Sequence, residues 1–212
     1  MRPSERVLDL AARDDLGLAP HYLAIWSAVV GLEAEVVLEF GAGGSTVVVL
    51  EALAALGGEA PTRRRLLSCS TESQAEIARR YGPMPPDVLW EHRQCLSEAL
   101  DLPPGGSFDF VLHDGSHAAD VVEADLRLAL PRLWRFGLAF VHDTQHSYVG
   151  NEMRSALRAL LSTPPCTLSS TTLPYGFGLT ILRREDGDNP FTPQRRKRGS
   201  SHRTVPETLR CP

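Results

Sequence analysis

Apolar and polar positions alternate along the chain in two ways, as short apolar runs and as longer segments with helical spacing. Apolar runs that predict buried strands lie at residues 35–40, 65–69, 88–92, 108–113 and 136–141. Segments that predict helices lie at residues 45–56, 71–82, 118–133 and 151–161. In the second of these helices, Thr71 and Gln74 have the spacing of a capping box. Strands that alternate with helices build a parallel sheet with helices on both faces.

The last two predicted strands, at residues 167–173 and 178–183, are connected differently. Pro174-Tyr175-Gly176 lies between them and is too short for a crossover, so this pair should form an antiparallel hairpin. We therefore predict an α/β fold with a doubly wound, mostly parallel, seven-stranded sheet and an antiparallel C-terminal hairpin. Ligands of such sheets bind at the carboxyl ends of the strands.

The pattern divides the chain into three segments. Residues 1–33, with Pro20 at the start of a helix that runs through Trp26, should form a helical cap over the strand ends. Residues 34–184 hold the predicted sheet. Residues 185–212 are rich in Pro, Ser and Arg and low in apolar residues, which predicts a flexible tail.

Charge is distributed unevenly around the overall net charge of −4. Residues 191–212 carry six basic residues and one acidic residue, which leaves a net charge of −9 on residues 1–190. The body should therefore repel nucleic acid. The basic tail is either a docking element for an acidic partner or a dispensable extension.

Composition excludes several protein classes. At 42% apolar and 23% charged residues, the 212-residue chain is typical of a globular protein. It contains no apolar run of the roughly 18 residues that a spanning helix needs, and its first residues lack the apolar core of a secretory signal. We expect a cytoplasmic protein with no membrane partner. The only lysine, Lys197, lies in the tail, which argues against Schiff-base and Walker-type chemistry.

The sharpest motif is a glycine-rich turn after the first predicted strand, Glu39-Phe40-Gly41-Ala42-Gly43-Gly44-Ser45. Glycine at positions 41 and 43 allows a tight turn and lets the backbone approach a ligand closely. A dinucleotide fingerprint would need a third glycine where Thr46 stands. An acidic residue two positions before the first glycine favours a cationic cofactor over a diphosphate.

This motif resembles the first motif of class I S-adenosylmethionine-dependent methyltransferases, which have a Rossmann-like fold. A second block, Phe108–Thr144, is similar to the small-molecule O-methyltransferase branch of macrocin-type sugar methyltransferases and cephalosporin-hydroxylase-like proteins. In that branch the fourth strand ends in Asp-Gly-x-His and the fifth in His-Asp or Asp-Asp. Leu173–Leu182 resembles the branch's final hairpin. The resemblance covers roughly residues 20 to 184.

The resemblance implies a binding site for S-adenosylmethionine. Gly41, Ala42 and Gly43 would line the methionine part, with Glu39 oriented toward the amino group. The acidic residue that usually holds the ribose is replaced by Ser70, so Glu72 either takes over that role or is a solvated glutamate in the first turn of a helix. Cys95 follows the third strand, where the family contacts adenine. The cofactor-binding residues implied are Glu39, Gly41, Ala42, Gly43, Ser45, Ser70, Glu72, Cys95 and Asp114.

Four of the seven histidines lie in the two segments that follow the fourth and fifth strands. Methyl transfer from a sulfonium is an in-line displacement, so the enzyme must align the acceptor and remove its proton. His117 is our first candidate for the base and His142 the second, with Asp114 beside them. Strand alternation turns His113 away from Asp114, which predicts that its side chain is buried beneath the helices.

A metal is the alternative way to deprotonate the acceptor. Related methyltransferases, including catechol O-methyltransferase, place Mg²⁺ between a carboxylate after the fourth strand and an Asp-Asp or Asp-Asn pair after the fifth. The matching residues here are Asp114, Asp143 and Thr144, whose hydroxyl is neutral. Carboxylates favour Mg²⁺, whereas the nearby imidazoles would also admit another divalent cation.

The most specific hypothesis is an enzyme that methylates an oxygen of a small secondary metabolite, with a His/Asp base or a metal removing the proton. A nicotinamide-dependent oxidoreductase is the alternative enzyme, which Thr46 disfavours. A non-catalytic, cofactor-binding regulatory subunit is the alternative outside enzymes. The sequence leaves a homo-oligomer open.

Overall fold

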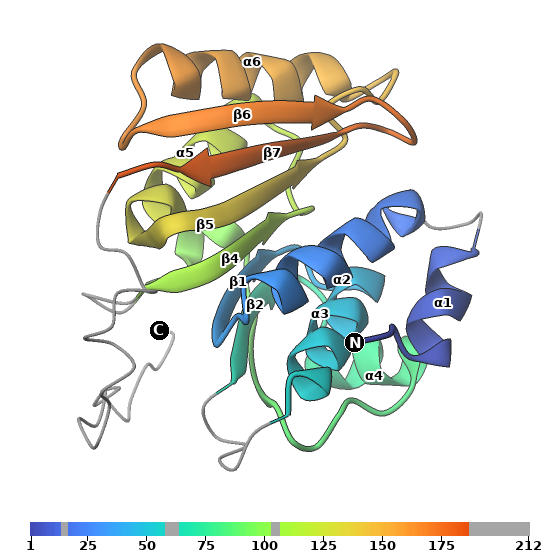
Figure 1. Cartoon of the computed structure of the whole chain (residues 1–212). Helices are drawn as coiled ribbons and strands as arrows, with labels where there is room; N and C mark the ends of the chain where they lie inside the picture. The colour runs from blue at the N-terminus through green and yellow to red at the C-terminus, as the bar shows by residue number, and fades with distance from the viewer. Residues whose placement is uncertain (14–16, 58–63, 103–106, 187–212) are drawn as a thin grey trace.

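The molecule is built on one mixed β-sheet with helices on both faces (Figure 1). The computed structural model describes residues 1–13, 17–57, 64–102 and 107–186. The seven strands lie in the order β3-β2-β1-β4-β5-β7-β6. The first five strands in chain order run parallel, and β7 is antiparallel to both β5 and β6. The predicted doubly wound sheet and its closing hairpin are confirmed.

The strand bounds follow the apolar runs closely. They are β1 Val36–Phe40, β2 Arg65–Ser70, β3 Leu89–Gln94, β4 Phe108–His113, β5 Leu133–His142, β6 Leu168–Leu173 and β7 Leu179–Arg184. All five residues of β1 are buried, as expected for a central parallel strand. The order of strands changes direction between β1 and β4, and their carboxyl ends flank the point where doubly wound sheets bind ligands.

Helices divide between the two faces of the sheet. Their bounds are α1 Glu5–Ala11, α2 Tyr22–Gly31, α3 Gly44–Ala55, α4 Gln74–Tyr81, α5 Ala119–Ala129 and α6 Gly150–Ser162. The helices α2 and α3 cover one face of the central strands, and α5 and α6 cover the other (Figure 1). Each face has its own buried apolar cluster, one around Phe110 and Phe140 and the other around Phe40 and Val111.

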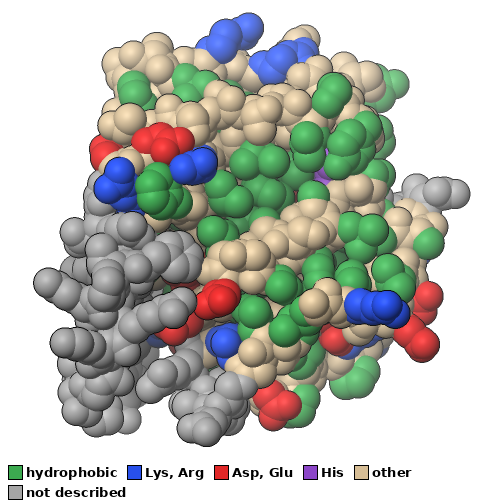
Figure 2. Space-filling view, in the orientation of Figure 1, with side chains coloured by type: hydrophobic (Ala, Val, Ile, Leu, Met, Phe, Trp, Pro, Cys, Tyr) green, Lys and Arg blue, Asp and Glu red, His purple; other side chains and the backbone are tan. Residues whose placement is uncertain are grey.

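On the face of α2 and α3, apolar side chains gather at the surface between α2 and β7 (Figure 2). Three of the exposed apolar side chains of the described residues lie on these segments: Leu23 on α2, and Tyr175 and Phe177 on the loop before β7. On this face, the region between α2 and β7 is therefore covered less than the central strands are.

The structure corrects two sequence-based helix bounds. The box that begins α4 is formed by Ser73 and Glu76, whose side chains each bond the other's backbone N–H, and not by Thr71 and Gln74. The helix predicted to run to residue 133 ends at Ala129. Pro131 follows in the short 3-10 helix η4 (Leu130–Arg132), and Leu133 already begins β5. Proline lacks the N–H that would continue the helix.

The N-terminal segment packs mainly on the helical layer. The helix α2 lies against α3, and both contribute to the apolar cluster on that face. The short 3-10 helix η1 (Ala19–His21) precedes α2 and brings His21 to the end of β5, where its ring meets that of His142. None of the described helices is long and apolar enough to cross a bilayer. The predicted basic tail lies, from residue 187 onward, outside the described residues.

Candidate active site

The glycine turn after β1 contacts the end of β4 directly. Gly41 has a φ of 87°, in the left-handed region that favours glycine, and its N–H donates to the Cys69 carbonyl at 2.9 Å. A Cβ at Gly41 would overlap the backbone carbonyl of Asp114. Glycine is required at this position because two backbone segments meet there.

Gly43 is a glycine for a different reason. Its φ of −177° is extended, so its backbone conformation suits any residue. A Cβ there would meet only the Tyr81 hydroxyl within 4 Å, at 3.8 Å. The open space beside Gly43 fits the predicted close approach of a ligand to the backbone.

Glu39 is fully buried at the end of β1 and is held by the first turn of α3. Ser45 Oγ donates to Glu39 Oε1 and Thr46 Oγ1 donates to Glu39 Oε2, each at 2.7 Å. Burial raises the pKa of Glu39 to about 8, although the two hydroxyls act in the opposite direction. Thr46 Oγ1 also accepts from the Gly43 N–H at 2.9 Å, which joins the carboxyl group to the glycine turn.

This arrangement corrects the orientation predicted for Glu39. The carboxylate was expected to face a ligand's amino group, but Glu39 and Ser45 have almost no surface open to a ligand in this conformation. Glu39 instead supports the turn from behind. Thr46 takes part in this support, a role that was not predicted from the sequence. Its place three residues after the helix N-cap is the signal that could have revealed it.

Ser70, Glu72 and Cys95 lie at the ends of the neighbouring strands β2 and β3. Ser70 Oγ donates to the Glu72 carbonyl at 3.2 Å, and Arg80 pairs with the Glu72 carboxylate at 2.5 Å. The Glu72 ion pair is partly exposed, and such pairs contribute little to stability. Cys95 is half-buried just after β3. These side chains occupy the same edge of the sheet as the glycine turn.

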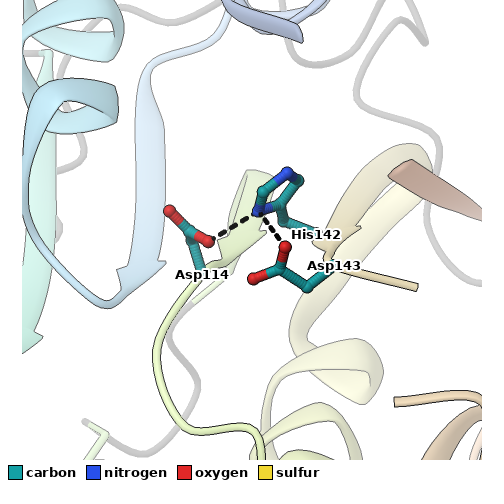
Figure 3. Close-up of side chains that lie close together, drawn as sticks. All are labelled: Asp114, His142 and Asp143. Atoms are coloured by element: carbon teal, nitrogen blue, oxygen red, sulfur yellow. Dashed lines mark hydrogen bonds and ion pairs between the residues drawn. The ribbon is translucent and has the colours of Figure 1, made fainter. Parts of the chain in front are cut away.

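A cluster of one imidazole and two carboxylates forms where β4 and β5 end (Figure 3). His142 Nδ1 lies 2.9 Å from Asp114 Oδ1 and 3.4 Å from Asp143 Oδ1. The three side chains each offer one ligand atom, and these atoms lie within 4.8 Å of one another. Asp143 has a φ of 59°, which is unusual outside glycine, and its carboxylate turns back toward β4.

The cluster shifts the charge states of its members. Burial acts to lower the pKa of His142, but the hydrogen bonds and charges of Asp114 and Asp143 outweigh it and raise this pKa to about 9. Burial likewise acts to raise the pKa of Asp143, but hydrogen bonds from His117 and His142 hold it well below its usual range. At neutral pH the cluster therefore contains an imidazolium between two carboxylates.

His117 reaches the cluster from the loop after β4. Its Nε2 lies 2.7 Å from Asp143 Oδ2, and 39% of its side chain is exposed. The hydrogen bond to Asp143 raises the pKa of His117. It is thus the more accessible of the two imidazoles that contact Asp143.

Thr144 does not join the cluster, contrary to the predicted metal set. Its side chain is buried, and its hydroxyl accepts from Thr180 Oγ1 on β7 at 3.1 Å. The third group beside Asp114 and Asp143 is the imidazole of His142. The strained backbone of Asp143 changes the direction of the chain, so Thr144 follows a different path from the strand alternation that sequence spacing assumes.

His113 is buried, as predicted from its place on β4. Its Nε2 lies 3.1 Å from Asp125 Oδ2 on α5, and both side chains are inside the apolar layer. Asp125 was not predicted to face either the sheet or the solvent. Its position three residues after Val122 is the signal that it faces the sheet.

Aromatic and imidazole rings surround the buried side of His142. His21 is fully buried, with its ring centroid 5.6 Å from that of His142, and burial together with His142 lowers its pKa to about 4. Phe177 lies 4.4 Å from His146 and 6.4 Å from His142, measured between ring centroids. The Gln145 N–H donates to the Phe177 carbonyl at 2.7 Å, so the hairpin loop is bonded to the turn after β5.

Comparison with protein families identifies residues 38–144 as a match to a family described as "Methyltransferase domain". The match begins in β1 and ends at Thr144, just after the cluster. Comparison with curated protein sequences found no match.

Solved structures with the same fold include several methyltransferases. One is the O-methyltransferase TomG from Streptomyces achromogenes, which is involved in tomaymycin synthesis and was solved with S-adenosylmethionine. TomG is 20% identical to this chain, with a TM-score of 0.59, and the match covers 87% of this chain and 92% of TomG. An O-methyltransferase from Bacillus cereus is 17% identical, with a TM-score of 0.58 over 85% and 90% of the two chains. MycE from the mycinamycin biosynthetic pathway, solved with Mg, S-adenosylhomocysteine and mycinamycin VI, is 14% identical, with a TM-score of 0.56 over 86% of this chain and 53% of MycE.

Proposed function

Because the chain belongs to the methyltransferase domain family and is a class I S-adenosylmethionine-dependent methyltransferase, we propose that it methylates a hydroxyl oxygen of a small metabolite. The observation that carries the proposal is the contact between two turns. The glycine turn after β1 touches the backbone of Asp114, whose side chain belongs to the His/Asp cluster. A cofactor at the first turn would therefore lie beside ionisable groups suited to an acceptor.

The glycine turn fits the methionine part of S-adenosylmethionine. Gly41, Ala42 and Gly43 would line it, and the open space beside Gly43 leaves room for the ligand. Bound there, the cofactor supplies an electrophilic methyl group on a sulfonium. Glu39 acts indirectly, because Ser45 and Thr46 transmit its position to the turn.

The rest of the cofactor would extend along the ends of β2 and β3. Ser70 and Glu72 are placed for the ribose, and Cys95 for the adenine. The Glu72 carboxylate would exchange its partly exposed partner, Arg80, for ribose hydroxyls. Asp114 lies between this region and the acceptor side.

His117 and Asp143 are proposed to form the base that deprotonates the acceptor. Asp143 Oδ2 holds His117 Nε2, which leaves Nδ1 of the same ring to take the hydroxyl proton. Asp143 orients the imidazole and stabilises the imidazolium that forms. A positioned base of this kind typically contributes about 10²- to 10⁴-fold to a rate. His142, held as an imidazolium by two carboxylates, is poorly suited to the same role.

The cluster of Asp114, His142 and Asp143 also fits a divalent cation, because its three ligand atoms converge. Such a cation, when bound, would acidify and orient the acceptor hydroxyl. Transfer that continues unchanged in EDTA would exclude a metal from the reaction and leave His117 as the sole means of deprotonation.

The acceptor is proposed to be a small secondary metabolite. Two proteins of the same fold, TomG and MycE, are involved in tomaymycin synthesis and the mycinamycin pathway, and this supports the proposal by analogy of fold. Screening purified protein with labelled S-adenosylmethionine against a panel of hydroxylated metabolites tests it directly.

Two variants separate the cofactor role from the acceptor role. Gly43→Val should abolish binding of S-adenosylhomocysteine in calorimetry, because the side chain fills the open space. His117→Ala should keep that binding and lose turnover. Equal loss of binding in both variants would refute the division of roles. Full cofactor affinity without any methylated product across the panel would instead favour a regulatory subunit.

A further inference from the structure

We propose that His92, on β3, is a positioning residue for the ribose of the cofactor. Through a hydrogen bond to the Glu72 backbone carbonyl, it holds the segment that carries the Glu72 carboxylate. This inference deepens the proposed function and rests on it in one respect, that Glu72 binds the ribose hydroxyls. Ligand binding alone tests it, without an acceptor and without turnover.

The register of two neighbouring strands brings His92 to its partners. In the parallel pair of β2 and β3, Ser68 lies opposite His92. Trp90 is two residues earlier on β3, and side chains two residues apart on a strand share a face. The ring centroids of Trp90 and His92 are 5.6 Å apart. Trp90 packs against the apolar cluster on the face of α2 and α3, so the imidazole lies on that face, beside a packed indole.

Three hydrogen bonds connect these side chains to the loop after β2. Trp90 Nε1 donates to Ser68 Oγ at 2.8 Å. Ser68 Oγ lies 2.9 Å from His92 Nδ1, and His92 Nε2 lies 2.8 Å from the Glu72 carbonyl oxygen. The bonds form a continuous chain that starts on β3, passes through the fully buried Ser68 and ends on the loop.

The two ends of this chain determine the direction of every hydrogen bond in it. An indole N–H can only donate, and a backbone carbonyl can only accept. Ser68 Oγ therefore accepts from Trp90 and donates its own hydrogen to His92 Nδ1. The ring hydrogen then lies on Nε2 and points at the Glu72 carbonyl. Burial lowers the pKa of His92, so the ring is neutral near pH 7, as this tautomer requires.

The loop that carries Glu72 is held at two successive carbonyls. The Glu72 carbonyl accepts from Ser70 Oγ at 3.2 Å in addition to His92 Nε2. The Thr71 carbonyl accepts from Gln94 Nε2, also at 3.2 Å. Gln94 is exposed, whereas His92 is half-buried and is bonded at its second nitrogen as well. His92 therefore makes the more rigid of the two contacts from β3.

Holding the peptide group of Glu72 determines where its side chain leaves the loop. The Glu72 carboxylate pairs with Arg80, whose side chain is 53% exposed. An exposed ion pair of this kind contributes little. The backbone bonds, more than Arg80, therefore set the direction of the carboxylate. A carboxylate that binds two hydroxyls at once depends on that direction, because a pair of parallel hydrogen bonds adds geometric specificity.

The test measures the binding of two ligands by calorimetry, S-adenosylhomocysteine and its 2′,3′-dideoxy analogue, which lacks both ribose hydroxyls. Hydrogen bonds to a charged group are strong, so wild-type protein should bind the first ligand about 10- to 100-fold more tightly. His92→Leu keeps the bulk of the side chain and removes the donor, and it should reduce this preference to about threefold or less. Its affinity for the dideoxy analogue should not change.

Two further variants show whether the hydrogen bond itself matters. His92→Gln provides an amide N–H for the Glu72 carbonyl and should restore most of the preference that His92→Leu loses. Ser68→Ala removes the hydroxyl that holds Nδ1 of the ring, without touching the loop, and should reduce the preference by a smaller factor than His92→Leu does. Circular dichroism and thermal unfolding check that each variant is folded.

His146→Leu is the matched control. His146 is another half-buried imidazole that bonds backbone N–H groups, those of Tyr148 and Val149, but it lies after β5. Its replacement should leave the preference for the ribose hydroxyls unchanged. A loss as large as that of His92→Leu would overturn the inference, because the preference would then depend on the site as a whole.

Other outcomes also overturn the inference. They are a wild-type preference in His92→Leu, or a loss of affinity in that variant by the same factor for both ligands. Equal binding of the two ligands by wild-type protein would make Glu72 a solvated glutamate, and the inference would fall with that assignment. Failure of the proposed methyl transfer is distinguishable. The expected ligand preferences without a methylated product from any acceptor would contradict the function and leave the role of His92 intact.

Discussion

Two turns at the same edge of the sheet carry acidic residues whose pKa values are shifted in opposite directions. Glu39, at the end of β1, is buried and accepts hydrogen bonds from two hydroxyls, and burial raises its pKa to about 8. Asp143, at the end of β5, is held by two imidazoles that keep its pKa well below its usual range. The first turn has open space beside its backbone at Gly43, and the second carries an ionised side chain. The contrast shows that what surrounds a carboxyl group, more than its place after a strand, determines its charge state.

The largest expected effect concerns the first turn. Gly41→Ala should destabilise the fold by about 3 kcal/mol or more, because the added Cβ overlaps the Asp114 backbone and the left-handed φ is strained. Gly43→Ala should unfold at nearly the wild-type denaturant midpoint and lose affinity for S-adenosylhomocysteine. Chemical unfolding and calorimetry on the pair measure both. Similar denaturant midpoints for the two variants would mean that the close contact between Gly41 and the Asp114 backbone does not stabilise the fold.

The next effect concerns the second turn. Asp143→Asn should lower the rate of methyl transfer by about 100-fold or more, because His117 loses the carboxylate that orients it. Binding of S-adenosylhomocysteine should stay within a few-fold of wild type. If Asp143→Asn also loses binding of S-adenosylhomocysteine, the turn after β5 holds the cofactor as well, and the separation of cofactor and acceptor roles is wrong.

The pH dependence of transfer should report His117. Its pKa is raised by Asp143, and a base works only in its unprotonated form, so kcat/KM should fall about tenfold per pH unit below that raised pKa. The midpoint of the fall should lie above the ordinary value of 6.5. Asp143→Asn should move the midpoint down, because the carboxylate no longer stabilises the imidazolium. If the midpoint stays where it is in wild type, the fall of kcat/KM at low pH belongs to another group.

The last effect concerns Glu39 and is visible in stability rather than rate. The folded protein keeps the Glu39 proton to about pH 8, whereas the unfolded chain releases it near pH 4.5. The unfolded state thus binds fewer protons between these values, and stability should fall as the pH rises through this window. Glu39→Gln cannot ionise and should lack this part of the fall. Denaturant midpoints at pH 5, 7 and 9 for both proteins provide the comparison.

The central strands β1, β4 and β5 were predictable because each contains an apolar run. The hairpin was predictable because three residues cannot form a crossover. The end of α5 was missed, since the apolar spacing continues past Ala129 even though Pro131 stops the helix. Periodicity indicates which side of an element is buried more reliably than where the element ends.

The site was only partly predictable. Adjacent strand ends bring Asp114 and Asp143 together, and this follows from the order of strands. The capture of His142 between them does not, because the left-handed backbone of Asp143 depends on local packing. His21 is more than a hundred residues away along the chain, and no local pattern places it against His142. Long-range side-chain partners of this kind are set by the assembled layers.

The bond between the hairpin loop and the turn after β5 has a consequence for how this enzyme changes over evolution. The Gln145 N–H holds the Phe177 carbonyl, and Phe177 packs on His146. A change in the length or path of this loop would therefore also move the residues next to Asp143. A loop transplanted here from another protein would need compensating changes around Gln145.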